Sequence, residues 1–184
     1  MIPIIVDGPA VEPVSVPEMR AHLRLDGEDE GALVAALIRA ARLTVEAAAR
    51  TILVETRFRL VLDRWPRGGA LRLPVGPLMA VERVAVVGRA GAAQALDPAL
   101  WEVDAADPPR LVVGPDAPQP GRRRRGIEVV LTAGHGPAPA DVPEPLRQAV
   151  RLLAAHWFEH RGDDGAPWPA SLHALVAPYR RPRL

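Results

Sequence analysis

The clearest candidate for a metal-binding or catalytic site is the sequence His-x-x-Glu-His, the inverted zinc-protease motif. His156 and His160 are four residues apart, so on a helix they share one face, as two zinc ligands must. A zinc site also needs a third protein ligand, and no second acidic motif offers one. Both histidines fall at the end of the predicted helix, where the helix dipole stabilises a charged imidazole. We therefore expect no metal, no cofactor and no catalytic residue, and keep a small zinc-dependent hydrolase as an alternative.

The four consecutive arginines Arg122, Arg123, Arg124 and Arg125 are the only basic run in the sequence. Such a run can bind phosphates, can form a solvated hairpin tip, or can meet acidic residues of a neighbouring chain. No aromatic residue interleaves with the arginines, so the run offers no stacking platform for single strands. The formal net charge of +1 likewise gives no reason to expect specific nucleic-acid binding.

The overall composition indicates a soluble globular protein and excludes several chemistries. Hydrophobic residues make up 48% and charged residues 24% of the 184 positions, which is ordinary for such a protein. The absence of cysteine excludes disulfides, zinc ribbons and thiol catalysis. The sequence has no P-loop, no G-x-S-x-G and no dinucleotide-binding glycine pattern. It also lacks a long uncharged apolar run and a start typical of a secretory signal, so we expect no membrane span and no export.

Two long amphipathic segments are predicted to form a helical core. The first, 28–50, begins in an acidic cluster that lacks the EF-hand ligand spacing and suits a helix N-terminus. It carries two adjacent apolar stripes, Val34, Ile38, Ala41, Val45 and Ala48 in one and Leu33, Leu37, Ala40 and Ala47 in the other. Its opposite face is expected to be polar, with Arg39, Arg42, Glu46 and Arg50. The second helix, 143–161, has one apolar face, and we expect the two helices to pack together.

Between these helices the hydrophobic period changes to the alternation of strands. Strands separated by turns rich in Gly and Pro are predicted at 54–62, 70–74, 79–87, 101–104, 110–113 and 127–131, and a loop is predicted at 88–97. The predicted fold class is therefore α+β, a small antiparallel helical bundle with an inserted antiparallel β subdomain.

The same patterns predict the limits of each part of the chain. Residues 16–51 and 134–178 form the helical bundle core, and residues 52–133 form the inserted β subdomain. Residues 1–15 form an extended N-terminal arm, which lies either on its own domain or on a neighbouring copy. Residues 179–184 form a short basic C-terminal tail.

Six segments of the chain follow one another in an informative order. They are VPEMRAHLRLDGEDEGALVAALIRAARLTVEAAAR, TILVETRFRLVLDRWP, LRLPVGPLMAVERV, VVLTAGHG, VPEPLRQAVRLLAAHWFEHRG and ALVAPYR. In this order they resemble the head–tail connector (adaptor) family of long-tailed phages, prophages and gene transfer agents. The resemblance covers residues 16–180, with the N-terminal arm and residues 88–126 as its variable parts.

The resemblance implies a structural function with no catalysis and no cofactor. Proteins of this family form a ring, commonly of twelve copies, beneath the portal protein of the filled head. The ring extends the DNA channel, through which DNA passes without sequence-specific binding, and provides a platform for the next neck, stopper or tail component. The chain would be made in the bacterial cytoplasm and assembled into the neck of a phage or phage-like particle. A nucleic-acid-binding packaging accessory is a further alternative.

Two sets of residues are candidates for the interfaces of such a ring. The resemblance implies that the C-terminal segment reaches the portal, with Leu172, Leu175, Val176, Tyr179, Arg180, Arg181, Arg183 and Leu184. A ring of heterologous contacts needs two complementary patches on each subunit. Opposite charge suggests one such pair, the acidic Glu28, Asp29 and Glu30 with the basic Arg122, Arg123, Arg124 and Arg125. Because DNA must slide through the channel, we expect the arginine run not to line it.

Overall fold

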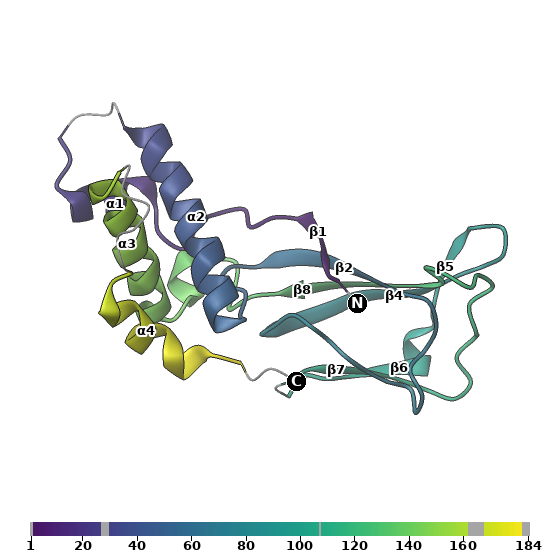
Figure 1. Cartoon of the computed structure of the whole chain (residues 1–184). Helices are drawn as coiled ribbons and strands as arrows, with labels where there is room; N and C mark the ends of the chain where they lie inside the picture. Colours follow the sequence, from purple (N-terminus) through teal and green to yellow (C-terminus); the bar gives the residue numbers. More distant parts are fainter. Residues whose placement is uncertain (1, 27–29, 107, 162–167, 182–184) are drawn as a thin grey trace. The chain divides into compact units, whose positions relative to one another are not determined.

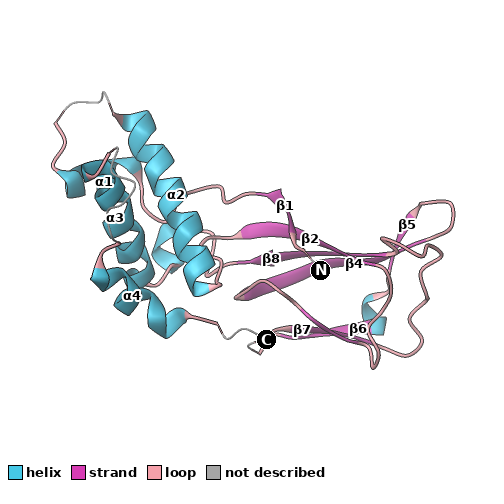
Figure 2. Cartoon of the chain, viewed as in Figure 1, coloured by secondary structure: helices cyan, strands magenta, loops and turns pink. Residues whose placement is uncertain are grey.

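The computed structural model describes residues 2–26, 30–106, 108–161 and 168–181, and the chain divides into two compact units (Figure 1). Met1–Gly8 and Glu55–Gly134 form the first unit, which we call the β unit. Pro9–Val54 and His135–Leu184 form the second, which we call the helical unit because its regular elements are helices (Figure 2). Each unit is thus built from two separate stretches of the chain, and the observed fold is α+β, as the sequence predicted.

The described part of the helical unit contains α1 (Val16–Leu23), α2 (Gly31–Ala49), α3 (Glu144–Glu159) and α4 (Ala170–Val176), with 3₁₀ turns at Pro139–Asp141 and Ala177–Tyr179. Local sequence signals explain where α1 begins and ends. Ser15 caps its N-terminus, since the Ser15 hydroxyl accepts a hydrogen bond from the Glu18 N–H at 3.2 Å. Arg24, in the left-handed conformation, ends the helix.

Helices α2 and α3 pack against each other in the core of the helical unit, which confirms the expected pairing of the two long helices. The buried face of α2 includes Val34, Ile38, Ala41 and Val45, and that of α3 includes Leu146, Ala149, Val150 and Leu153. None of these side chains is more than 1% exposed. Complete burial of each larger one contributes about 1.5–3 kcal/mol, so this cluster is a main source of the unit's stability.

The larger sheet of the β unit is antiparallel, with strand order β1-β2-β8-β4-β5. Its strands are β1 (Ile4–Asp7), β2 (Thr56–Leu62), β4 (Leu78–Val87), β5 (Ala93–Ala95) and β8 (Ile127–Ala133). The register pairs Phe58 with Leu131 and Val84 with Val129, and all four side chains are buried. Along β2 and β8 the buried side chains alternate with partly or fully exposed ones such as Arg59, so this sheet has one apolar face and one mixed face.

A smaller antiparallel sheet has the order β3-β7-β6, with β3 (Ala70–Arg72), β6 (Trp101–Asp104) and β7 (Arg110–Val113), and a 3₁₀ turn at Pro98–Leu100 precedes β6. Leu71, Leu111 and Val113 of this sheet are buried, and Figure 1 draws it beneath the larger sheet. The loop from β7 to β8, residues 114–126, contains the arginine run.

Three local features differ from the sequence-based expectations or decide between them. Residues 4–7 of the expected arm pair with β2 as an edge strand of the chain's own sheet. The predicted loop at 88–97 contains the short strand β5, which pairs with β4. Arg42, expected on the polar face of α2, is only 6% exposed because it is enclosed with two carboxylates.

Among the described residues, no helix is both long and apolar enough to cross a bilayer.

Candidate interaction surfaces

The arginine run lies in a loop whose base is fixed on the end of β4. The Gly121 N–H donates to the Val87 carbonyl at 3.0 Å, and the Val87 N–H donates to the Gly126 carbonyl at 2.8 Å. A Cβ atom at Gly121 would lie 2.5 Å from the backbone nitrogen of Arg89, so this close approach of two backbones requires glycine. The loop is therefore anchored at its base, while the side chains of Arg122–Arg125 are exposed.

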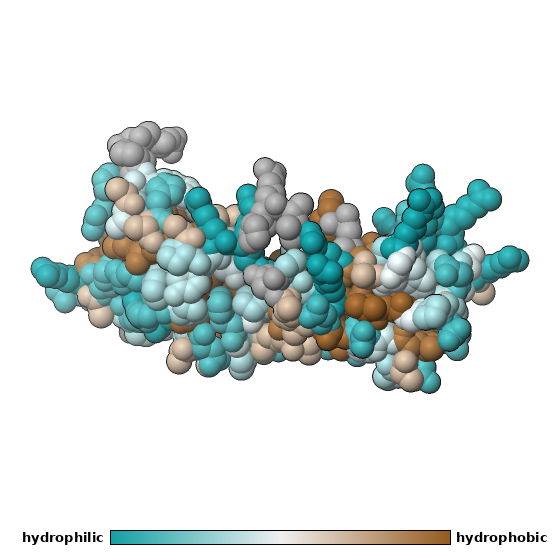
Figure 3. Space-filling view, turned by 90° about the horizontal axis from the view of Figure 1, so that it is seen from below, coloured by the Kyte–Doolittle hydropathy of each residue, from teal (hydrophilic) through white to brown (hydrophobic). Residues whose placement is uncertain are grey.

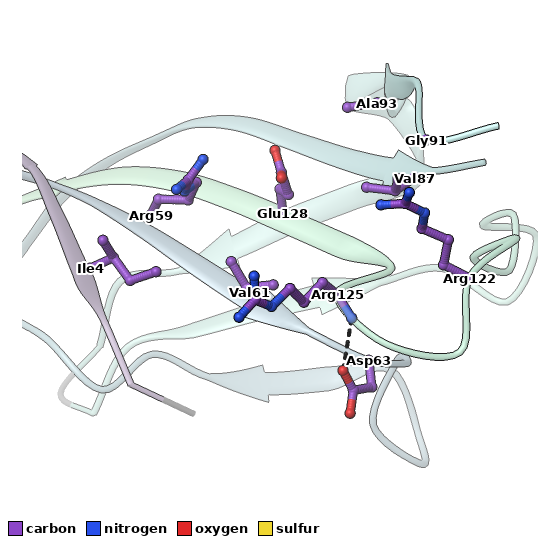
Figure 4. A pocket seen from close by; sticks show the side chains of 10 residues that line it. All are labelled: Ile4, Arg59, Val61, Asp63, Val87, Gly91, Ala93, Arg122, Arg125 and Glu128. Carbon is purple, nitrogen blue, oxygen red and sulfur yellow. Dashed lines mark hydrogen bonds between the residues drawn. The ribbon is translucent and has the colours of Figure 1, made fainter. Parts of the chain in front are cut away.

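The two ends of the arginine run have defined surroundings. The Arg125 N–H donates to the Asp63 carboxylate at 2.8 Å, and Arg125 has a positive φ of 53° (Figure 4). The Arg122 guanidinium lies against Gly91, where an added Cβ would be 3.0 Å from Arg122 Nη2. Within the described part of the chain, none of the four guanidinium groups makes an ion pair. Their positive charge is therefore available to an anionic group of another molecule.

A cavity of about 460 Å³ lies between this loop and the mixed face of the larger sheet (Figure 4). Its charged lining residues are Arg59, Arg122, Arg125, Asp63 and Glu128, and the rest of the lining is Ile4, Val61, Val87, Gly91 and Ala93. The three guanidinium groups attract a phosphate but the two carboxylates repel it, whereas a protein surface can match both signs of charge and the apolar floor. This cavity fits a protein contact better than a nucleic-acid contact.

Of the acidic residues expected to pair with the arginine run, Glu28 and Asp29 lie outside the described residues. Glu30 precedes the first residue of α2, and its carboxylate forms an ion pair with Arg161, whose Nη2 lies 2.7 Å from Glu30 Oε1. The Arg161 guanidinium also stacks on the Phe158 ring, 4.0 Å from its centroid. Glu30 therefore has a cationic partner within its own unit.

The C-terminal segment divides into a buried part and an exposed part. Leu172 and Val176 are each 2% exposed and attach α4 to the helical core. Leu175 and Tyr179 are half-buried against the same core, whereas Arg180 is exposed. The Arg181 N–H donates to the Ala49 carbonyl at 3.0 Å. Arg183 and Leu184 lie outside the described residues, so the accessible part of the candidate portal contact begins at Leu175.

The two histidines of the His-x-x-Glu-His sequence lie at the C-terminal end of α3. Their ring centroids are 4.4 Å apart, and His160 Nδ1 donates to the His156 carbonyl at 2.9 Å. That hydrogen bond occupies one ring nitrogen of His160 and ties it to the helix end. Among the described residues, no group of three or more His, Cys, Asp or Glu side chains could hold a metal ion. The geometry thus offers two imidazoles at a helix terminus without a third described ligand.

Comparison with known proteins identifies the family. No protein-family model and no curated protein matches the sequence. A chain in the neck of an empty gene transfer agent particle, computed with C6 symmetry, has a TM-score of 0.87 and 32% identity, covering 100% of this chain and 97% of that one. This chain belongs to the head–tail connector family. Chains matched with the same coverage occur in a native gene transfer agent virion, with a TM-score of 0.83 and 30% identity, and in a native neck computed with C12 symmetry, with 0.81 and 31%.

The connector contains a buried charge cluster that the sequence pattern did not reveal. Arg42 donates to Glu12 at 2.7 Å and to Glu46 at 3.0 Å, and Glu46 also accepts the Leu53 N–H at 2.9 Å. Burial raises the pKa of Glu46, and the Leu53 N–H and Arg42 only partly oppose this shift. Glu12 is 30 positions before Arg42, so no local periodicity could have linked them.

A second charge network joins α1 to α3 in the connector. The Glu18 carboxylate accepts from Arg147 Nη2 at 2.9 Å and from Arg151 Nη1 at 2.5 Å. Glu144 forms ion pairs with the same two arginines, and the hydrogen bond from Arg151 is the main cause of its lowered pKa. Through these ion pairs, Arg147 and Arg151 fix the position of α1 on α3.

Proposed function

We propose that the chain is a structural connector subunit in the neck of a gene transfer agent or a related tailed-phage particle. Copies form a ring of twelve beneath the portal, extend the DNA channel and join the head to the next neck, stopper or tail component. The observation that carries this proposal is the similarity over the full chain to neck chains of gene transfer agent particles, one of them computed with C12 symmetry. The function requires no catalytic residue and no cofactor.

The C-terminal segment is proposed to contact the portal. Leu172 and Val176 position α4 through the helical core, so the contact itself is made by Leu175, Tyr179 and the basic tail with Arg180 and Arg181. Arg183 and Leu184 extend the same tail. Anchoring a short segment in this way reduces the conformational entropy that the segment loses on binding.

The arginine run is proposed to lie at a contact between adjacent subunits rather than on the channel wall. Support comes from guanidinium groups that make no ion pair with any described residue, and from the mixed charge of the cavity beside them. A channel lined by such arginines would bind phosphates strongly and slow the passage of DNA. The proposed acidic partner is the cluster Glu28, Asp29 and Glu30 of the next subunit, with Glu30 exchanging or sharing its Arg161 partner.

Deletion of the gene in the host that produces the particles tests the proposed function. We expect DNA-filled heads without tails in electron micrographs, and restoration of tailed particles by a plasmid copy. A tagged chain should co-purify with the portal protein and appear in intact particles in about the same copy number as the portal subunits. Tailed, DNA-delivering particles from the deletion strain would contradict the proposal.

A further inference from the structure

The outward face of α2 carries an exposed row of apolar residues, the outward stripe, that no described part of the chain covers. It consists of Leu33, Ala36, Ala40, Leu43 and Ala47, which are all exposed. The two leucines are 37% and 49% exposed. Successive members are three or four positions apart, so they lie in one row along the helix. This row is on the side of α2 opposite the residues that pack on α3, such as Ile38 and Val45.

This outward stripe contains no charged residue. The charged side chains within α2 are Arg39, Arg42 and Glu46, and each makes an ion pair within the helical unit. The one hydroxyl beside the stripe, on Thr44, donates to the Ala40 carbonyl of its own helix at 2.9 Å. A helix that is apolar on two opposite sides is typical of one that is buried on both. The isolated subunit thus leaves exposed a surface that another protein is expected to cover.

The dimensions of the stripe favour a contact along the side of the subunit. From Leu33 to Ala47 the row extends for about 21 Å at the helical rise per residue. Three of its five members are alanines, which let a partner backbone approach the helix closely. Apolar contacts without charged groups are characteristic of permanent interfaces, such as those between subunits of an oligomer.

A second group of exposed apolar side chains lies in the N-terminal segment. Ile2 is 82% exposed, Ile5 56%, Val6 46% and Ile4 45%. They belong to the N-terminal segment and the edge strand β1, whereas the other large exposed hydrophobic residues outside the stripe are isolated from one another in sequence. Five extended residues span about 16 Å, which fits within the length of the stripe. On the face of the molecule shown in Figure 3, hydrophobic patches lie among strongly hydrophilic side chains.

We propose that in the assembled ring the outward stripe of α2 is covered by the N-terminal segment, residues 2–6, of the adjacent copy. The inference rests on the proposed ring, because a closed ring requires two different surfaces that meet between neighbours. The C6 and C12 symmetries of the similar necks are consistent with identical neighbours on both sides of each copy. The stripe and the N-terminal segment are two such different apolar surfaces on one chain.

Cysteine cross-linking in assembled particles tests the contact directly, because the chain has no cysteine of its own. Particles are produced from cells that express two tagged forms of the chain, one with Leu43→Cys and one with Ile4→Cys. We expect oxidation to yield a disulfide-linked dimer of the two forms. The thiol introduced by Leu43→Cys should also react with maleimide more slowly in particles than in the isolated chain, by about tenfold or more, because the contact excludes the reagent. The control pairs Leu43→Cys with Ala21→Cys, which is exposed on α1, and should give no heterodimer.

A double-mutant comparison tests whether the two surfaces belong to one contact. Leu43→Ser and the pair Ile2→Ser with Ile4→Ser, two positions apart on the extended segment, should each lower incorporation into particles about tenfold, and the combination should lower it little further. All three side chains are at least 45% exposed, so thermal unfolding of the isolated chain should be unchanged. Multiplicative losses, a Leu43→Cys thiol that reacts freely in particles, or no heterodimer would overturn the inference. Absence of the chain from particles would instead overturn the proposed function.

Discussion

In the helical unit arginines join one segment of the chain to another, whereas in the β unit most arginines extend into solvent. Arg42 links α2 to the segment before α1, and Arg147 and Arg151 link α3 to α1. In the β unit, Arg57 pairs with Asp7 and Glu82, but the described residues give the arginine run no ionic partner. Arginines thus stabilise the helical unit internally, whereas the arginine run of the β unit has no ionic partner among the described residues and is available for intermolecular contacts.

The largest effect on stability is expected from breaking the buried cluster of the helical unit. Arg42→Met removes the cation between Glu12 and Glu46 and leaves their carboxylates partly buried without it. Loss of one partner from a buried pair costs about 3–5 kcal/mol in the free energy of unfolding. Denaturant titration of the isolated chain measures this loss. The control is Arg39→Met, whose side chain is 69% exposed and which should cost less than about 1 kcal/mol.

A smaller loss is expected when the link between α1 and α3 is weakened. Glu18→Gln replaces a carboxylate that accepts from two arginines, and should lower the free energy of unfolding by about 1–2 kcal/mol. The matched variant in the β unit is Glu82→Gln, whose partner Arg57 is exposed, with an expected cost below about 1 kcal/mol. Equal losses for the two variants would show that the units do not differ in this respect.

Periodicity predicted much of this arrangement because it depends on which side chains face a core. The pairing of α2 with α3 and the central strands β2, β4 and β8 follow from apolar spacing along continuous segments. The strand β5 was missed because its three residues are all exposed and are defined only by pairing with β4. The burial of Arg42 was missed because it depends on Glu12, far away in the sequence.

The sequence predicted which residues make up the candidate surfaces, but not which other residues they contact. The sequence identified the arginine run, yet nothing in it indicated that Arg125 is held by Asp63 or that Glu30 is paired with Arg161. The predicted second stripe of α2 coincides only in part with the exposed row, because Leu37 is half-buried against the core, whereas Leu43 was not assigned to a stripe and is exposed. Periodicity cannot distinguish an apolar residue that packs inside the subunit from one that is covered by another chain. The exposure of Leu33, a member of the second stripe, could be established only from the three-dimensional structure.

His135 is an exception among the well-paired polar groups of the helical unit, and the pH dependence of the free energy of unfolding tests its role. Burial lowers the pKa of His135, and its Nε2 has no hydrogen-bond partner among the described residues. The unfolded chain therefore binds a proton more readily, and stability falls as the pH decreases through about 6.5 toward the lowered pKa. Relative to His135→Gln, the wild type should lose at most about 1.4 kcal/mol per pH unit in this window, measured by denaturant titration. A difference between the two proteins that stays constant from about pH 8 to about pH 5 would contradict the assignment.

The smallest effect on folding, combined with a large effect on assembly, is expected for the arginine run. Arg122→Glu, Arg123→Glu and Arg124→Glu change exposed side chains and leave Arg125, with its positive φ and its bond to Asp63, in place. The free energy of unfolding of the isolated chain should change by less than about 0.5 kcal/mol, because no ionic partner in the described residues is lost. Ring formation on the portal should nevertheless weaken.

The dependence on salt distinguishes a charged contact between subunits from an unrelated defect. If the run meets carboxylates of the next copy, the wild-type ring should loosen as salt rises, whereas the glutamate variant, which replaces attraction by repulsion, should assemble better in high salt than in low salt. A triple lysine variant keeps the charge and should assemble nearly as well as the wild type. Unchanged assembly of the glutamate variant would show that the arginine run does not contribute to the contact between subunits. The run would then differ from the arginines of the helical unit only because it lacks an ionic partner among the described residues.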